Sequence, residues 1–142
     1  MSVLITDAGF AADHWTYGFQ AVDSLSKILP VPLALDIFNT FQPEALSPLL
    51  AEVDLIRITF PSFSDGRGFS LARQLRLLGY VGRLRASGPL LADQYAMLRR
   101  AGFDEVEVPD EIAVRQPESQ WLARANWQAN DYQKRLRQFD GL

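Results

Sequence analysis

Short strand patterns and helical patterns alternate along residues 31–109, and this alternation constrains the fold more than any other feature of the sequence. The predicted strands and the helices between them cover residues 32–36, 43–51, 54–60, 69–78, 83–87, 90–101 and 104–108. Short strands that alternate with helices of about 10 residues pair in parallel through right-handed crossovers. The sequence therefore predicts an α/β fold with a parallel sheet of about four strands.

The predicted central strands alternate apolar and charged residues. Arg57 lies between Ile56 and Ile58, Arg85 lies between Leu84 and Ala86, and Glu107 lies between Val106 and Val108. A sheet covered by helices on both faces has nearly continuous hydrophobic strands, so the alternation favours helices on one face. A half-barrel fits this pattern, and a three-layer sandwich with partly solvated edge strands is the alternative. In the half-barrel, the charged side chains face the concave side, beneath the C-terminal helix or a second subunit.

Two flanking regions complete one predicted domain of residues 1–142, a length typical of a single domain. Residues 1–30 contain short apolar stretches on either side of Asp7-Ala8-Gly9, which predicts a small peripheral hairpin. A C-terminal helix is predicted over residues 118–139, with an apolar stripe of Trp121, Ala125, Ala129, Tyr132, Leu136 and Phe139. The stripe docks on the sheet or on a second chain, and Trp127 lies off it as an exposed partner contact. Pairing of open sheet edges predicts a homodimer.

The composition excludes several classes of protein. The net charge of −3 argues against general binding to nucleic acid or to a membrane surface. The chain contains no cysteine, and His14 is its only histidine, so no iron–sulfur cluster, two-histidine metal site or thiol nucleophile is expected. The sequence shows neither a basic leader with an apolar stretch nor a run of about 20 apolar residues, which predicts a soluble cytoplasmic protein.

The loop at residues 60–70 is the best candidate for a functional site. Gly66 and Gly68 permit a sharp turn, and the helix that follows presents free amides and a positive dipole end, with Arg67 and Ser70 nearby. We expect these residues to bind a small anion such as sulfite, sulfate, phosphate or a carboxylate. In the alternative reading, Asp65 or Ser64 caps the helix and Arg67 is solvated.

Further charged residues are candidates for the same site. Asp65 and Asp93 begin helices at the carboxyl edge of the sheet and are the candidate catalytic acids or bases, although acids there often only favour the helix start. Arg57 and Arg85 are candidate anion-binding residues. Their alternative role is a structural ladder of ion pairs with Glu105 or Glu107.

A dinucleotide site is disfavoured. Gly66-Arg67-Gly68 follows a strand, but Leu71 replaces the third glycine of the fingerprint and no acid follows the next strand. The sequence leaves open whether a flavin or a nucleotide binds, so the cofactor is unknown.

Residues 60–73, Gly82–Ala86, Gly88, Asp93-Gln94 and residues 98–104 carry a family resemblance. They resemble an uncharacterised bacterial family, domain of unknown function nine-three-four, which is described as a probable oxidoreductase involved in sulfite reduction. The resemblance covers about residues 32–108. It implies a link to assimilatory sulfite reduction and a sulfite reductase as partner, and it is the only ground for an oxidoreductase activity.

Two functions follow from these observations. The first is a non-catalytic accessory or anion-binding component of sulfite reduction, which fits the absence of thiols, metal ligands and a dinucleotide fingerprint. The second is a small enzyme that acts on an anionic substrate at the loop of residues 61–70. In that enzyme Arg67, Arg57 and Arg85 hold the anion, and Asp65 or Asp93 moves protons.

Overall fold

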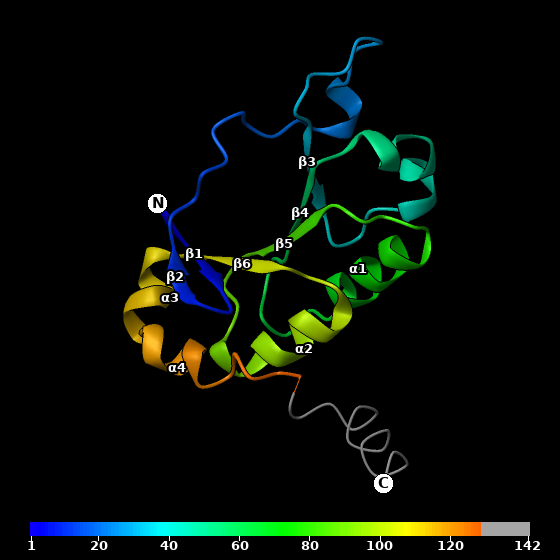
Figure 1. The fold of residues 1–142 in the computed structure, drawn as a ribbon. Helices are drawn as coiled ribbons and strands as arrows, with labels where there is room; N and C mark the ends of the chain where they lie inside the picture. The colour runs from blue at the N-terminus through cyan, green and yellow to red at the C-terminus, as the bar shows by residue number, and fades with distance from the viewer. Residues whose placement is uncertain (129–142) are drawn as a thin grey trace, which may run out of the picture.

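The protein, described here by a computed structural model over residues 1–128, has a six-stranded mixed sheet in the order β2-β1-β6-β5-β4-β3 (Figure 1). The strands are β1 Ser2–Thr6, β2 Gly9–Ala11, β3 Ala34–Phe38, β4 Leu55–Thr59, β5 Arg83–Ser87 and β6 Glu105–Pro109. Strands β3 to β6 pair in parallel, whereas β1 is antiparallel to both β6 and β2. The mixed α/β class predicted from the sequence is confirmed.

The helices include α-helical and 3-10 segments. They are η1 Val22–Ser24, η2 Pro43–Glu52, α1 Arg67–Leu77, η3 Ala92–Gln94, α2 Tyr95–Ala101, α3 Asp110–Arg115 and α4 Glu118–Leu122. The predicted helix at residues 43–51 is a 3-10 segment with Pro48 inside it, and proline lacks the N–H that an α-helix interior needs. Helix α3 was not predicted. None of the helices in residues 1–128 is long and apolar enough to cross a membrane.

The predicted N-terminal hairpin forms, but it pairs with β6 and extends the sheet to six strands, so it is not peripheral. Val3 and Ile5 in β1 lie opposite Val108 and Val106 in β6. Ile5 is fully buried in the core. Burial of apolar surface at the edge of β6 therefore draws the hairpin into the sheet.

The apolar residues of the strands form one core with the helices. In the strand register, Ile56 lies beside Leu84, and Ala86 lies beside Val106. Helices α1 and α2 contribute buried leucines to this core and lie side by side along the same face of the sheet (Figure 1). The helices therefore leave the opposite, charged face of the strands to another segment of the chain.

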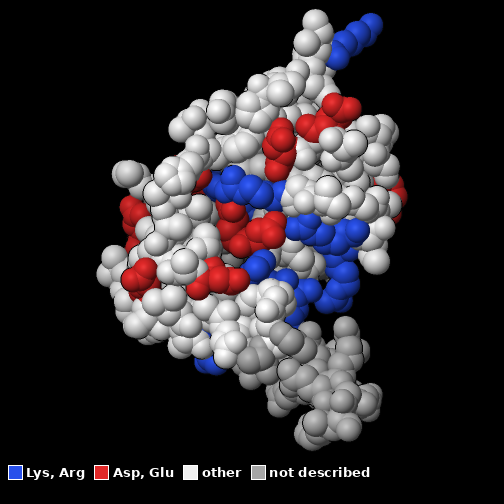
Figure 2. Space-filling view, viewed as in Figure 1, with Lys and Arg blue, Asp and Glu red and all other residues white. Residues whose placement is uncertain are grey.

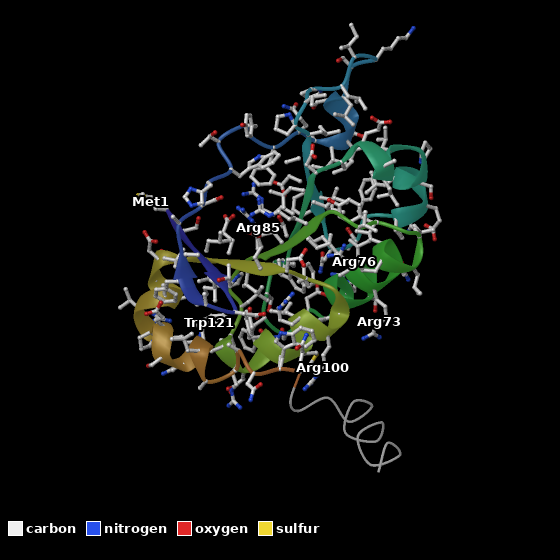
Figure 3. The ribbon with its side chains drawn as sticks, viewed as in Figure 1. Met1, Arg73, Arg76, Arg85, Arg100 and Trp121 are labelled. Carbon is white, nitrogen blue, oxygen red and sulfur yellow. The ribbon has the colours of Figure 1, made fainter. Side chains whose placement is uncertain are left out.

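Helix α4 ends at Leu122, earlier than predicted. Residues 123–128 are not helical, and the predicted stripe residues Ala129, Tyr132, Leu136 and Phe139 lie outside the described residues. Trp121 is 1% exposed, belongs to the core, and meets the Tyr95 ring edge-on at 6.2 Å. Figure 3 shows Trp121 and Arg85 on opposite sides of the strands. Trp121 and its helix α4 thus do not cover the charged face, and residues 129–139 of the predicted helix lie outside the described residues.

Candidate functional site

The loop between β4 and α1 ends in a tight contact between Asp65 and Arg67. Asp65 Oδ1 accepts hydrogen bonds from the backbone N–H of Arg67 at 3.2 Å and from Arg67 Nε at 2.9 Å. The second carboxylate oxygen pairs with the Arg67 guanidinium as well. Gly66 is the residue before the helix and has no side chain that could cap it. Asp65, one residue earlier, instead accepts the hydrogen bond from the backbone N–H of Arg67, the first helical residue.

The charge state of Asp65 limits its chemistry. Hydrogen bonds from Arg67 and from the Asn39 amide hold the pKa of Asp65 far below its usual range. A carboxyl group with so low a pKa stays ionised near neutral pH and is a weak proton acceptor. The geometry therefore favours an electrostatic role for Asp65 over proton transfer.

A pocket of about 390 Å³ lies between residues 39–43 and the start of α1. Its polar lining consists of Asn39, Thr40, Gln42, Arg67, Ser70 and Gln74. Asn39 follows the end of β3 and is 5% exposed, and its amide lies next to the Asp65 carboxylate. The Arg67 side chain is 63% exposed. The pocket thus gathers a buried amide, a hydroxyl and an accessible guanidinium at a helix N-terminus.

The two loop glycines have different surroundings. A Cβ on Gly68 would lie 2.2 Å from the Phe60 ring, so glycine is needed there for close packing of α1 on β4. A Cβ on Gly66 would meet only the Phe69 ring at 3.9 Å. Gly68 thus positions the helix start, and Gly66 is spatially tolerant of a side chain.

Asp93 lies at the next helix start along the sheet. Its carboxylate is 80% exposed and pairs with Arg124 at 2.7 Å. Its neighbour Gln94 donates a hydrogen bond to the Phe63 carbonyl at 2.7 Å, which ties η3 to the loop of residues 61–66. Asp65 and Asp93 thus belong to connected segments, but each has a different arginine as its partner.

Arg57 and Arg85 lie on the charged face of the sheet among carboxylates. We call this cluster the charged row; its members are Asp13, Asp36, Arg57, Arg83, Arg85, Glu105 and Glu107. Arg57 pairs with Asp36 at 2.7 Å, and Arg85 pairs with Glu105 at 2.6 Å. Figure 2 shows acidic and basic side chains next to one another over the middle of the molecule. Within residues 1–128, no group of three or more His, Cys, Asp or Glu side chains is arranged to hold a metal ion.

A segment of the N-terminal region, residues 12–20, covers the charged row. Asp13 binds Arg85 through two hydrogen bonds of 2.9 and 3.0 Å. The Phe19 ring lies 3.8 Å from the Arg57 guanidinium, and Gln20 forms a bridge with Leu35 in β3. Sequence reasoning missed Asp13 and Phe19, because no local pattern connects them with strands at least 38 residues away.

The contact between Asp13 and Arg85 predicts a pH dependence of stability. Hydrogen bonds from Arg85 lower the pKa of Asp13, and they outweigh partial burial, which acts in the opposite direction. A carboxyl with a depressed folded-state pKa stabilises the fold above its unfolded pKa of about 3.9, and this contribution is lost as pH falls through the folded pKa. As the pH is lowered from about 6 to about 3, the free energy of unfolding of Asp13→Asn should therefore fall less than that of the wild type. Urea unfolding at each pH measures both values. Equal losses in the two proteins would contradict this linkage.

Comparison with known proteins places the fold in a family. The sequence model of a family described as Bacterial protein of unknown function (DUF934) matches residues 34–141. The chain belongs to this family. No curated protein matches the chain. The description of the matched family names no reaction, so the match assigns none to the pocket or to the charged row.

The DUF934 match divides the candidate residues into two groups. It includes Asn39, the Asp65–Arg67 contact, and every member of the charged row except Asp13. Asp13 and Phe19 precede residue 34 and lie outside the match. The family region thus supplies the pocket and most of the charged row, and the preceding segment supplies the cover.

Proposed function

We propose that this protein binds a small oxoanion or carboxylate in the pocket beside the N-terminus of α1, as an accessory component and not as a catalyst. The observation that supports this most directly is the Arg67 guanidinium, which is 63% exposed and lines a pocket together with Ser70 and the buried Asn39.

The electrostatics of the pocket favour an anion. Helix α1 has 11 residues, and its N-terminus carries a partial positive charge. Asp65 uses two donors of the Arg67 side chain, whereas a guanidinium has five N–H donors. The remaining donors of Arg67, together with the Ser70 hydroxyl, are available to a ligand.

The first anion to test is sulfite. We choose it because the sequence resembles a family that is described as involved in sulfite reduction. In the proposal a sulfite reductase is the partner protein, and the chain forms a homodimer. Sulfite is a small pyramidal oxoanion, and the amide, hydroxyl and guanidinium donors around the pocket suit its three oxygens.

An enzyme that acts on the bound anion, with oxidoreductase activity by resemblance, is the second candidate. The exposed Asp93 carboxylate favours it, because Gln94 ties this helix start to the loop beside the pocket. The depressed pKa of Asp65 argues against proton transfer by that residue, so we rank the accessory function above the enzyme.

Ligand-induced thermal stabilisation tests the binding site. We expect sulfite, sulfate or phosphate to raise the melting temperature of the wild type, because a ligand at 100 times its Kd adds about 2.7 kcal/mol of stability. The shift should vanish in Arg67→Ala, which removes the accessible guanidinium. Flavin and nicotinamide nucleotides serve as comparison ligands.

Arg73→Ala is the matched control, because Arg73 is exposed on the same helix and does not line the pocket. The control should keep the full shift (Figure 3 labels its position). A shift lost equally in both variants would indicate general charge attraction and overturn the proposed pocket. Turnover of the anion by purified protein would move the enzyme ahead of the accessory function.

A further inference from the structure

We propose that Arg85 is a receptor for a carboxylate from another molecule, and that Asp13 occupies this receptor in the present structure. This site lies on the charged face of the sheet and is distinct from the pocket beside α1. The ligand class is a free carboxylic acid or an acidic group of a partner protein, which share the carboxylate that Arg85 recognises.

The geometry around Arg85 divides its donors into an inner and an outer set. Arg85 is fully buried, and its Nε and one terminal nitrogen bond Glu105 and Glu107 at 2.6 and 2.9 Å. Both terminal nitrogens donate to the two oxygens of Asp13. Two nearly equal bonds between a guanidinium and a carboxylate form the bidentate arrangement that selects carboxylates over single acceptors.

The part of the chain that matches the DUF934 family supplies acceptors only for the inner donors of Arg85. Glu105 and Glu107 lie within residues 34–141, whereas Asp13 does not. Without Asp13, one terminal nitrogen of the buried guanidinium would keep Glu107 as its acceptor, and the other would have no acceptor among the remaining members of the charged row. A buried charged donor without an acceptor is strongly unfavourable, so an acceptor from another molecule would be stabilised at this position.

The segment that contains Asp13 has few buried contacts with the rest of the fold. Its residues 12–18 are exposed apart from the partly buried Trp15, and the indole of Trp15 bonds only to the nearby Gly18 carbonyl at 2.8 Å. The Asp13 side chain itself is 40% exposed. Few buried contacts imply a low free energy of local opening. A competing carboxylate therefore needs to displace a short exposed segment and not a part of the core.

The surroundings add a preference for an apolar group beside the carboxylate. The Phe19 ring lies over both Arg57 and Arg85, with 3.8 and 5.7 Å from ring centre to guanidinium carbon. A pocket of about 300 Å³ next to it is lined by Phe19, Phe38, Ile37 and Thr59 among others. The Phe19 ring thus offers an apolar contact beside Arg85 to a ligand that carries a small apolar group next to its carboxylate.

Chemical rescue tests the receptor. Asp13→Ala should lower the melting temperature by about 8 °C, because it leaves a buried cation partly unpaired. Sodium acetate should restore at least half of this loss, and sodium chloride at the same ionic strength should not. Both the variant and its reference carry Arg67→Ala, so that the pocket beside α1 does not contribute. A blocked pentapeptide with a central aspartate replaces acetate in a second arm and distinguishes a partner protein from a free acid.

Competition with Asp13 provides the decisive comparison. Acetate should bind the protein that retains Asp13 at least tenfold more weakly than it binds the Asp13→Ala protein, because the intact segment occupies the receptor. Equal affinities, or equal effects of acetate and chloride, would overturn the proposal. Asp13→Asn replaces Asp13→Ala if the alanine variant does not fold. Asp23→Ala, which removes an exposed carboxylate from the same N-terminal region, should show no rescue by acetate.

Discussion

Replacement of Arg85 by alanine should lower the free energy of unfolding by about 3–5 kcal/mol, because it removes the fully buried cation that Glu105 and Glu107 share. Arg85 is fully buried, and Glu105 beside it is only 5% exposed. Removal of one partner of a buried ion pair costs more than the pair contributes, since the remaining charge is left in a poorly solvated site. Urea unfolding followed by far-ultraviolet circular dichroism measures the loss.

Arg83→Ala is the matched control, because Arg83 lies in the same strand and pairs with the same Glu105. Its side chain is 42% exposed, so we expect a loss of at most about 1 kcal/mol. The difference in the loss of unfolding free energy between the two variants then measures the effect of burying the arginine and not the effect of the number of ion pairs. Similar losses in both variants would show that the charged row is not held together by Arg85.

The alternation of apolar and charged residues along the strands predicted which side chains share a face of the sheet, but it could not predict which segment covers that face. Alternation of apolar and charged residues is a local property, and it placed Arg57, Arg85 and Glu107 together correctly. The ion-pair ladder, weighed as the alternative to an anion pocket, follows from the same register. Asp13 reaches Arg85 across 72 positions of the chain, and such a contact leaves no mark in local sequence.

The strands and helices of residues 34–109 could be predicted, and the elements before and after them could be predicted only in part. Apolar periodicity continues beyond Leu122, yet the chain leaves the helix there. Tertiary contacts occupy these residues instead: Arg124 pairs with Asp93, and Trp127 lies over Arg99 and donates a hydrogen bond to Asp7. Trp127 is therefore packed against the fold and is not the free partner contact that the sequence suggested.

The pocket beside α1 could be predicted only from its loop. Glycines and charged residues between a strand and a helix mark a turn, and this pattern identified Arg67 and Ser70. Asn39 was missed because it belongs to no motif. Its position directly after β3, at the carboxyl edge beside the next parallel strand, is the signal that points to it, since parallel strands bring their following loops together.

Replacement of Trp121 by alanine should lower the free energy of unfolding by about 3–5 kcal/mol, the range expected for removing a buried tryptophan. Trp121 is 1% exposed and meets Tyr95 of α2 edge-on, while its indole N–H donates to the Gln116 carbonyl at 2.9 Å. Gln116 in turn accepts a hydrogen bond from the backbone of Ala92 in η3. Loss of the indole therefore removes core packing and loosens the link between the C-terminal residues and η3.

Leu122→Ala provides the comparison, because the neighbouring side chain is 43% exposed in the same short helix. We expect a loss within about 0.5 kcal/mol, typical of surface positions. Urea unfolding should separate the two variants clearly, and the ligand-induced shift at the pocket beside α1 should persist in Leu122→Ala. If both variants lose little stability, the docking of α4 contributes little to the fold. The core would then be closed by α1 and α2 against the sheet, with Tyr95 in place of Trp121 as its boundary.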